Sequence, residues 1–156
     1  HLTALNPAPF LIQELRRIGF DSASHYVLLP EWKGEYLQDY GSLAASRTAE
    51  WPGLLHQAGI PYFPSVSPGW DATARGVMHG GRRVKRYPWW PVVVGSRPER
   101  FRDFLAAAIR FSRRGGEHAL TFVASWNEWS EGHYLEPDER HGMGWLEAVR
   151  EARRLA

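Results

Sequence analysis

Residues 96–138, SRPERFRDFLAAAIRFSRRGGEHALTFVASWNEWSEGHYLEPD, decide the fold class of this chain. The stretch opens with a cap candidate, Ser96, and an early proline, and its apolar residues then recur at helical spacing until a pair of glycines ends the helix. Residues 119–125 (ALTFVAS) form an apolar and β-branched run that is typical of a buried strand. A polar loop, 126–138, follows at once, so the stretch indicates a helix, a strand and a loop in that order.

The same alternation extends toward the N-terminus and the C-terminus. Helices are expected over 9–18, 46–58 and 143–155, strands over 20–29 and 60–66, and a short extended piece over 92–94. Alternating helices and strands favour parallel strands joined by right-handed crossovers. A closed (β/α)8 barrel takes about 250 residues, whereas this chain has 156. We therefore expect a single domain, residues 1–156, that supplies part of such an architecture.

Composition excludes several classes of protein. With 44% hydrophobic and 23% charged residues, the chain can bury a core. The absence of cysteine excludes disulfides and thiolate chemistry. Uncharged stretches such as 87–96 are shorter than the roughly 20 residues of a membrane-spanning helix. A net charge of +2 argues against a duplex-binding face, and the compartment stays open.

Polar residues gather in three loops that follow expected strands. These loops are 21–26 with its continuation, 67–75 and 126–138. Because ligand sites in parallel α/β folds lie at the carboxyl ends of strands, we expect the three loops to converge on one face. The third loop holds Glu128 and Glu131, and glycoside hydrolysis uses two carboxyl groups in different environments. A Glu-x-x-Glu pair by itself is more often solvated charge on a helix.

Three segments resemble a known family. The segments GFDSASHY (19–26), FPSVSPGWDATAR (63–75) and SWNEWSEGHYLEPD (125–138) resemble, in this order, the C-terminal portion of glycoside hydrolase family 99 and its relatives. The relatives include a bacterial group often labelled glycosyltransferase-like and found with polysaccharide gene clusters. The resemblance implies an α/β fold that is the C-terminal part, about three to four β/α units, of a (β/α)8 TIM barrel. It also implies an enzyme that hydrolyses α-mannosides.

The resemblance assigns roles to the two carboxylates. Glu128 would take the proton of the sugar 2-hydroxyl, so that this oxygen attacks the anomeric carbon and gives an anhydro-sugar. Glu131 would protonate the leaving oxygen and then activate water, with net retention. This route needs no enzyme nucleophile and no cofactor, and we expect no metal because the histidines lack ligand spacing.

Further residues are expected near the substrate. The candidate substrate-binding residues are Tyr26, Trp70, Asp71, Arg75, Trp126, Asn127 and Trp129. Trp70 is expected to stack on a sugar face. An alternative for Asp71 and Arg75 is a pair that only braces its loop. Asn127 has the alternative of capping a turn, and Glu136 is expected to order its loop.

Other functions remain open at this point. The same glutamates could transfer a sugar to a sugar acceptor, or the chain could bind glycans without catalysis. A basic run with aromatic neighbours, residues 82–90, could hold single-stranded nucleic acid, but in a nearly neutral chain a solvated loop is the preferred interpretation. The expected partner is therefore an oligosaccharide or polysaccharide, with no nucleic acid and no membrane span. Exposed strand edges of a partial barrel would favour self-association or pairing with an N-terminal half.

Overall fold

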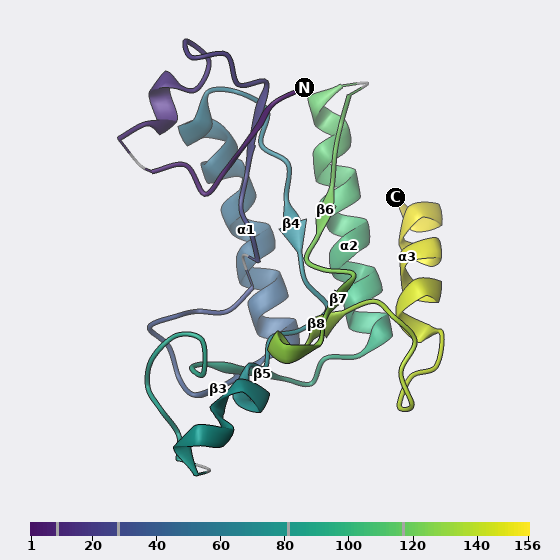
Figure 1. Cartoon of the computed structure of the whole chain (residues 1–156). Coiled ribbons are helices and arrows are strands. Elements are labelled where there is room, and N and C mark those ends of the chain that lie inside the picture. Colours follow the sequence, from purple (N-terminus) through teal and green to yellow (C-terminus); the bar gives the residue numbers. More distant parts are fainter. Residues whose placement is uncertain (9, 28, 81, 117) are drawn as a thin grey trace.

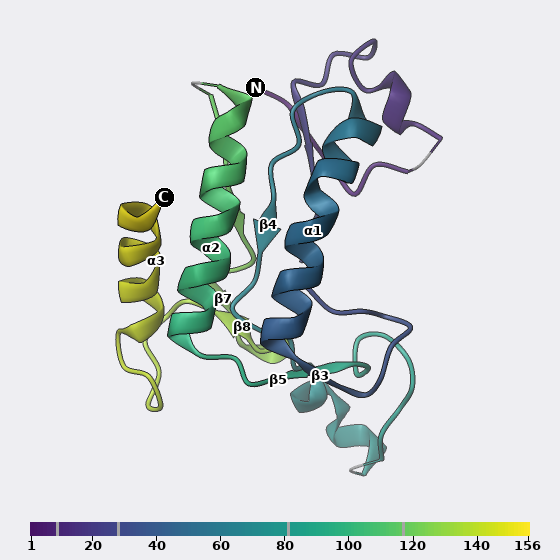
Figure 2. The same ribbon diagram turned by 180° about the vertical axis from the view of Figure 1, so that it is seen from behind.

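The computed structural model describes residues 1–8, 10–27, 29–80, 82–116 and 118–156. Three α-helices, α1 (Tyr40–Ala58), α2 (Pro98–Ser112) and α3 (Gly144–Leu155), lie side by side on one face of short strands (Figures 1 and 2). The strands are β1 (Thr3–Leu5), β2 (Ser22–Ser24), β3 (Leu37–Asp39), β4 (Ser65–Val66), β5 (Val92–Val94), β6 (Phe122–Val123), β7 (Asn127–Glu128) and β8 (His133–Tyr134). The 3-10 turns are η1 (Ile12–Glu14), η2 (Thr73–His79), η3 (Arg113–Gly115) and η4 (Trp129–Glu131).

Parallel pairing dominates the sheets, as the alternating order predicts. The pairs β1–β2, β3–β5 and β4–β6 are parallel, and only β7–β8 is antiparallel. Ala23 of β2 also bridges Tyr62 in parallel, and Tyr62 belongs to the segment that continues into β4. The parallel segments therefore follow one another in the order β1, β2, β4, β6. The described residues form this α/β arrangement and no closed barrel.

Aromatic rings fill the core between the helices and the strands. Trp51 of α1 stacks on Phe104 of α2 with ring centroids 5.7 Å apart. Phe101 of α2 meets Trp145 of α3 edge to face at 5.9 Å. The hydroxyl of Tyr40, at the start of α1, donates to the carbonyl of Ser67 at 2.8 Å. Helix α1 is thereby fixed to the loop after β4, which is one of the three loops expected to converge.

The helices after residue 40 agree with prediction except at their starts. Helix α1 begins six residues earlier than the expected 46–58, because Asp39 caps it by accepting from the Ser42 amide at 2.9 Å. It continues through Pro52, which is solvent-exposed and follows the buried Trp51. The cap predicted at Ser96 is wrong: the N-cap of α2 is Arg97, whose side chain makes no capping hydrogen bond.

The helix predicted over 9–18 is wrong, apart from residue 9, which lies outside the described residues. A single 3-10 turn, η1, takes its place. Leu15 is buried, but Phe10 and Ile18 point to solvent. The apolar stripe therefore has little to pack against, and a short helix is not stable without such packing.

Strands are shorter than predicted, and some were missed. The regions expected over 20–29, 60–66 and 119–125 reduce to two or three paired residues each, with residue 28 outside the described part. Strands β1 and β3 and the β7–β8 hairpin were not predicted, since each is too short to show a periodic pattern. Among the described helices, none is long and apolar enough to cross a membrane.

Candidate functional site

The two glutamates lie on a tight turn that packs against the loop after β4. Glu128 ends β7 and Glu131 ends η4. Gly132 then adopts a left-handed φ of 67°, and a Cβ atom there would lie 2.9 Å from the Asp71 amide nitrogen. Only glycine fits at this position, so the turn can lie close to the backbone of the loop after β4. At this separation the Asp71 amide donates to the Glu131 carbonyl at 2.8 Å. Two of the three expected loops therefore meet.

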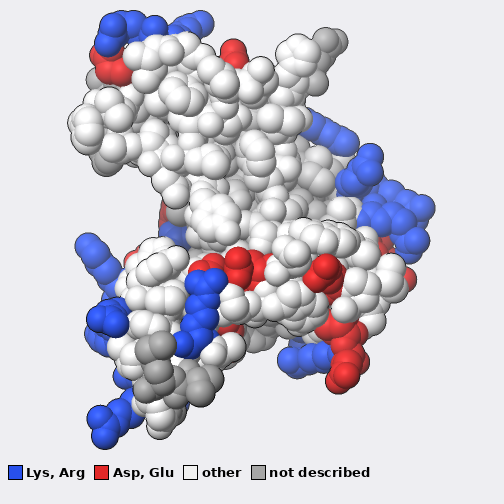
Figure 3. Space-filling view, viewed as in Figure 1, with Lys and Arg blue, Asp and Glu red and all other residues white. Residues whose placement is uncertain are grey.

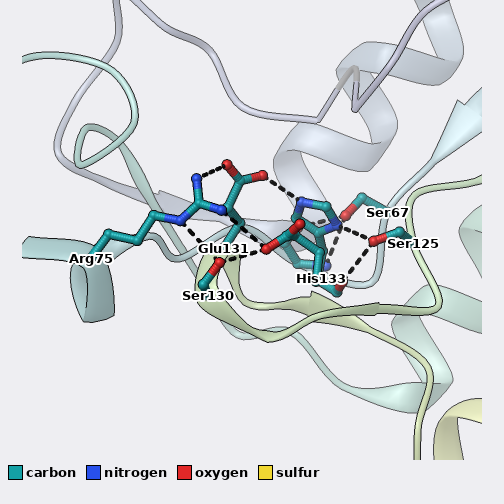
Figure 4. Close-up of polar contacts among 8 residues, drawn as sticks. Ser67, Arg75, Ser125, Ser130, Glu131 and His133 are labelled. Carbon is teal, nitrogen blue, oxygen red and sulfur yellow. Dashed lines mark hydrogen bonds and ion pairs between the residues drawn. The ribbon is translucent and has the colours of Figure 1, made fainter.

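Arg75 joins the two carboxylates with a single guanidinium. Its Nη1 donates to Glu131 Oε1 at 2.6 Å and its Nη2 to Glu128 Oε1 at 3.1 Å. Its Nε donates to the Ser130 hydroxyl at 2.9 Å. Figure 4 shows the Arg75 side chain reaching Glu131 and Ser130. The planar fork fixes the spacing of the two carboxylates, as a lysine ammonium could not.

The two carboxylates have different surroundings. The Glu131 side chain is 7% exposed and that of Glu128 is 35% exposed. The Ser130 hydroxyl donates to Glu128, and this bond, aided by the charge of Arg75, holds the pKa of Glu128 below its usual value. Glu128 is therefore ionised at neutral pH. One carboxylate is open to solvent and the other is enclosed.

His133 is a site residue that sequence reasoning did not select. It is fully buried, and its Nε2 lies 3.0 Å from Glu131 Oε2. Its Nδ1 lies 3.0 Å from the Ser125 hydroxyl, which also donates to the His133 carbonyl at 3.2 Å (Figure 4). His133 is therefore a buried, hydrogen-bonded histidine. The sequence feature that could have pointed to His133 is its position two residues after Glu131.

Trp70, Asp71 and Arg75 make contacts that the sequence did not specify. Trp70 is 2% exposed and stacks on the His133 ring with centroids 5.4 Å apart, so this face is not free to stack on a sugar. Asp71 accepts from the amide and hydroxyl of Thr73 at 2.9 and 2.6 Å. The alternative Asp71–Arg75 pair is absent among the described residues, because Arg75 turns to the glutamates instead.

Tyr26 lies near the glutamate pair, against His133. Its ring meets the edge of His133 with centroids 6.4 Å apart, while half of the residue stays exposed. Partial burial raises the pKa of the Tyr26 hydroxyl, and the charges of Glu131 and Glu128 raise it further. The hydroxyl is therefore a neutral donor near both carboxylates.

The remaining candidates form an exposed rim on the third loop. Trp129 stacks on Tyr134 with centroids 3.6 Å apart, and its Nε1 donates to Glu136 at 2.6 Å. Glu136 thereby orders the loop, as expected. Trp126 and Asn127 are exposed, and within the described part of the chain the Asn127 side chain makes no hydrogen bond that would cap a turn.

A cleft of about 710 Å³ adjoins the glutamate pair. It is lined by Asn6, Tyr26, Val27, Trp32, Lys33, Trp70, Lys85, Arg86, Tyr87 and Trp90. Tyr26 and Trp70 belong to this lining and also contact His133, which in turn contacts Glu131, so His133 links the cleft to the pair. We call it the aromatic cleft. Figure 3 shows this face with acidic side chains near its middle and basic ones toward its lower left.

No metal site accompanies the pair in the part of the chain that the structure describes. No group of three His, Asp or Glu residues there could hold a metal ion. The polar atoms around Glu131 are instead occupied by one another, through Arg75, His133 and Ser125. The arrangement can therefore move protons, with one enclosed and one open carboxylate, beside a cleft of a size suited to a sugar unit.

Comparisons of sequence point to one family. The family model described as "Glycosyltransferase WbsX" matches residues 19–149. Two curated relatives, both named "Uncharacterized protein WxcX" and from two strains of Xanthomonas campestris pv. campestris, are 32% identical over 154 residues and 38% identical over 92 residues. These matches cover 88% and 58% of this chain. The chain spans only 20% and 12% of the length of those relatives.

Comparison of structures points to a related fold. The GH99 endo-α-mannosidase from Bacteroides thetaiotaomicron aligns with a TM-score of 0.52 and 18% identity, over 97% of this chain and 42% of that one. The same enzyme in complex with bis-tris propane aligns with a TM-score of 0.50 and 19% identity, over 97% and 48%. Together with the sequence match, these alignments confirm the resemblance predicted from the three segments.

Proposed function

The chain belongs to the WbsX glycosyltransferase family and shares the fold of part of a family 99 enzyme, and from this premise we propose that it carries the acid–base pair of a glycosidase. In this proposal the chain is a single domain, residues 1–156, forming the C-terminal half of a (β/α)8 barrel that cleaves α-mannoside-type linkages. One observation carries the proposal. Arg75 holds an enclosed Glu131 and an open Glu128 side by side, next to the aromatic cleft.

Glu128 is the base of the first step. Its lowered pKa keeps it ionised, so it can accept the proton of the sugar 2-hydroxyl. The 2-oxygen then bonds to the anomeric carbon as the bond to the leaving oxygen breaks, and Glu131 gives its proton to that oxygen. The product is a 1,2-anhydro-sugar and a free alcohol, with both glutamates having exchanged their protonation states.

Glu131 reverses its role in the second step. As a carboxylate it accepts a proton from water, whose oxygen attacks the anomeric carbon from the side of the original leaving group. The bond from the anomeric carbon to the 2-oxygen breaks, and Glu128 returns the proton to the 2-oxygen. Two inversions at one carbon give net retention, and the two glutamates recover their starting protonation.

The hydrogen bonds around His133 support the acid role of Glu131. When the Ser125 hydroxyl donates its single hydrogen to the His133 carbonyl, His133 Nδ1–H donates to the Ser125 oxygen. The neutral ring then has only a lone pair at Nε2, and the partner there is Glu131 Oε2 at 3.0 Å. In this tautomer a hydrogen on Glu131 Oε2 would satisfy the Nε2 lone pair, and it is the hydrogen that an acid catalyst transfers.

Transfer to a sugar acceptor is the second candidate, and the name of the matching family favours it. The same pair would serve, with an acceptor hydroxyl in place of water in the second step. The aromatic cleft offers room for an acceptor sugar beside the pair. Hydrolysis and transfer therefore differ only in which oxygen attacks the intermediate.

The test is turnover of α-mannoside oligosaccharides by the longest gene product that carries this chain. Wild type is compared with Glu131→Gln, and product configuration is followed by NMR with and without an added acceptor sugar. We expect a retained product and a loss of at least about a hundredfold in kcat for the variant, the usual size of an acid catalyst's contribution. An acceptor-linked product would favour transfer over hydrolysis.

Glu139→Gln is the matched control, because Glu139 is exposed directly after the same loop. It is expected to keep the wild-type kcat. Inverted product, or an unchanged rate in Glu131→Gln, would contradict the assigned roles. If wild type binds glycan and turns none over, the chain is a binding module.

A further inference from the structure

The aromatic cleft carries positive charge that the chemistry at the carboxylates does not use. Lys33, Lys85 and Arg86 line it, and no described Asp or Glu does. In the described part of the chain, none of these three cations forms an ion pair, whereas Arg100 and Arg102 each pair with a carboxylate. Three unneutralised cations in a concave wall with no opposing carboxylate create a positive potential inside the cleft.

Aromatic rings supply the apolar part of the same wall. Trp32 meets Trp70 edge to face at 5.1 Å and Tyr87 at 5.3 Å. Trp32 and Tyr87 remain exposed, while Trp70 is buried behind them. Exposed, mutually supported rings suit the apolar C–H faces of a pyranose ring.

Two of the cations are positioned by aromatic rings. Lys85 Nζ lies 5.2 Å from the Trp90 ring centroid, and Arg86 Cζ lies 5.2 Å from that of Trp89. A cation–π contact orients the charge without occupying the N–H groups that point away from the ring. Both side chains therefore keep donors for a ligand.

We propose that the aromatic cleft binds a negatively charged sugar residue of the glycan, next to the residue whose linkage the glutamates act on. The inference rests on the proposed function, because it makes the cleft a neighbouring part of the same substrate site through the shared Tyr26 and Trp70. Charge-assisted hydrogen bonds from lysine and arginine bind carboxylates and phosphates alike. The carboxylate of a uronic acid and a sugar phosphate share this chemistry, and the experiment separates them.

The experiment measures binding by calorimetry with the longest gene product as Glu131→Gln, so that turnover does not consume the ligand. The ligands are a uronate-containing oligosaccharide, its carboxyl-reduced neutral form and a phosphorylated counterpart. We expect one charged ligand to bind about tenfold or more tightly than the neutral one, the size of a charged hydrogen bond. Whichever of the uronate and phosphorylated ligands binds more tightly identifies the charged group. Raising the salt concentration should reduce the difference in affinity between that ligand and the neutral one.

Lys85→Gln/Arg86→Gln is the test variant, and Arg82→Gln/Arg83→Gln is its matched control. The control removes the same charge from the same segment but outside the cleft lining. We expect the test variant to lose the preference for charge and the control to keep it.

Three outcomes would overturn the inference. These are equal affinity for charged and neutral ligands, an equal loss in the control, and displacement of the charged glycan by a nucleoside diphosphate, which would make the cations a nucleotide site. An enzyme that shows the charge preference but no turnover would count against the cleavage proposal alone.

Discussion

Glu128 and Glu131 share one guanidinium but differ in what else surrounds them. Glu128 receives the Ser130 hydroxyl and reaches solvent. Glu131 is enclosed and faces His133. Two chemically identical side chains three positions apart can therefore take opposite roles, because hydrogen bonding and burial act differently on their charged forms.

Ser130→Ala should move the acidic limb of the activity profile to higher pH. The Ser130 hydroxyl is the largest of the contacts that lower the pKa of Glu128, so its loss returns that pKa toward the ordinary value. A base works only when deprotonated, and a higher pKa means that its activity is lost at a higher pH as the solution is acidified. The measurement is kcat/KM against pH, with Ser42→Ala, whose hydroxyl bonds the distant Asp39, as the control. An unmoved limb would exclude Glu128 as the base.

Ser125→Ala should weaken the acid role proposed for Glu131. Without this hydroxyl, His133 Nδ1–H loses its acceptor and the Nε2–H form becomes favoured. Nε2–H then donates to Glu131 Oε2 and competes with the hydrogen that Glu131 transfers to the leaving oxygen. We expect kcat to fall about tenfold with little change in KM. Ser125→Thr keeps the hydroxyl and should restore kcat. A rise in KM as large as the fall in kcat in Ser125→Ala would indicate a structural role instead.

At the scale of elements, the local hydrophobic pattern predicted the long helices correctly. It failed over 9–18, where tertiary contacts decide whether a helix forms. Helix α2 buries the apolar stripe that the sequence predicts: Phe101, Phe104 and Leu105 are all buried. The helix expected over 9–18 has a comparable stripe that finds almost no partner. A hydrophobic period indicates a helix only when another element covers it.

Two helix caps can be compared at the scale of elements. Asp39 caps α1 in the structure, whereas Ser96 was predicted to cap α2 and does not. Asp39→Ala should lower the free energy of unfolding by about 1 kcal/mol, since the Ser42 amide loses its acceptor. Ser96→Ala should leave it nearly unchanged, because the Ser96 hydroxyl has no partner in the described residues. Chemical denaturation measures both. The Ser42 amide and Arg100 lower the pKa of Asp39, so the effect is full near neutral pH and shrinks as the pH falls through that pKa.

At the scale of the whole molecule, α3 fastens the loop after the site to the helical layer. Trp145 packs against Phe101, and its Nε1 donates to Asp138 at 2.9 Å. Asp138 also accepts from the His141 amide, and these bonds lower its pKa despite partial burial. The loop that carries the glutamates therefore ends on an anchored residue.

Trp145→Ala should destabilise the protein by about 3–5 kcal/mol, as expected for removal of a buried indole. Trp145→Phe keeps the ring but loses the bond to Asp138, and about 1 kcal/mol is expected. Urea unfolding measures both, with Leu155→Ala, exposed on the same helix, as the control. A loss as large for phenylalanine as for alanine would mean that the hydrogen bond, not the packing, holds α3.

The sequence by itself determined the alternation of helices with parallel strands, the helices α2 and α3, and the loops that carry the glutamates. These features depend on neighbours within one or two turns of chain, which a local pattern records. Only the tertiary structure decided what each carboxylate touches. Arg75 lies 56 positions from Glu131, and Trp70 turned inward to cover His133. Such contacts depend on how loops that follow different strands pack against one another. The spacing of residues along the chain does not show which loops will be in contact.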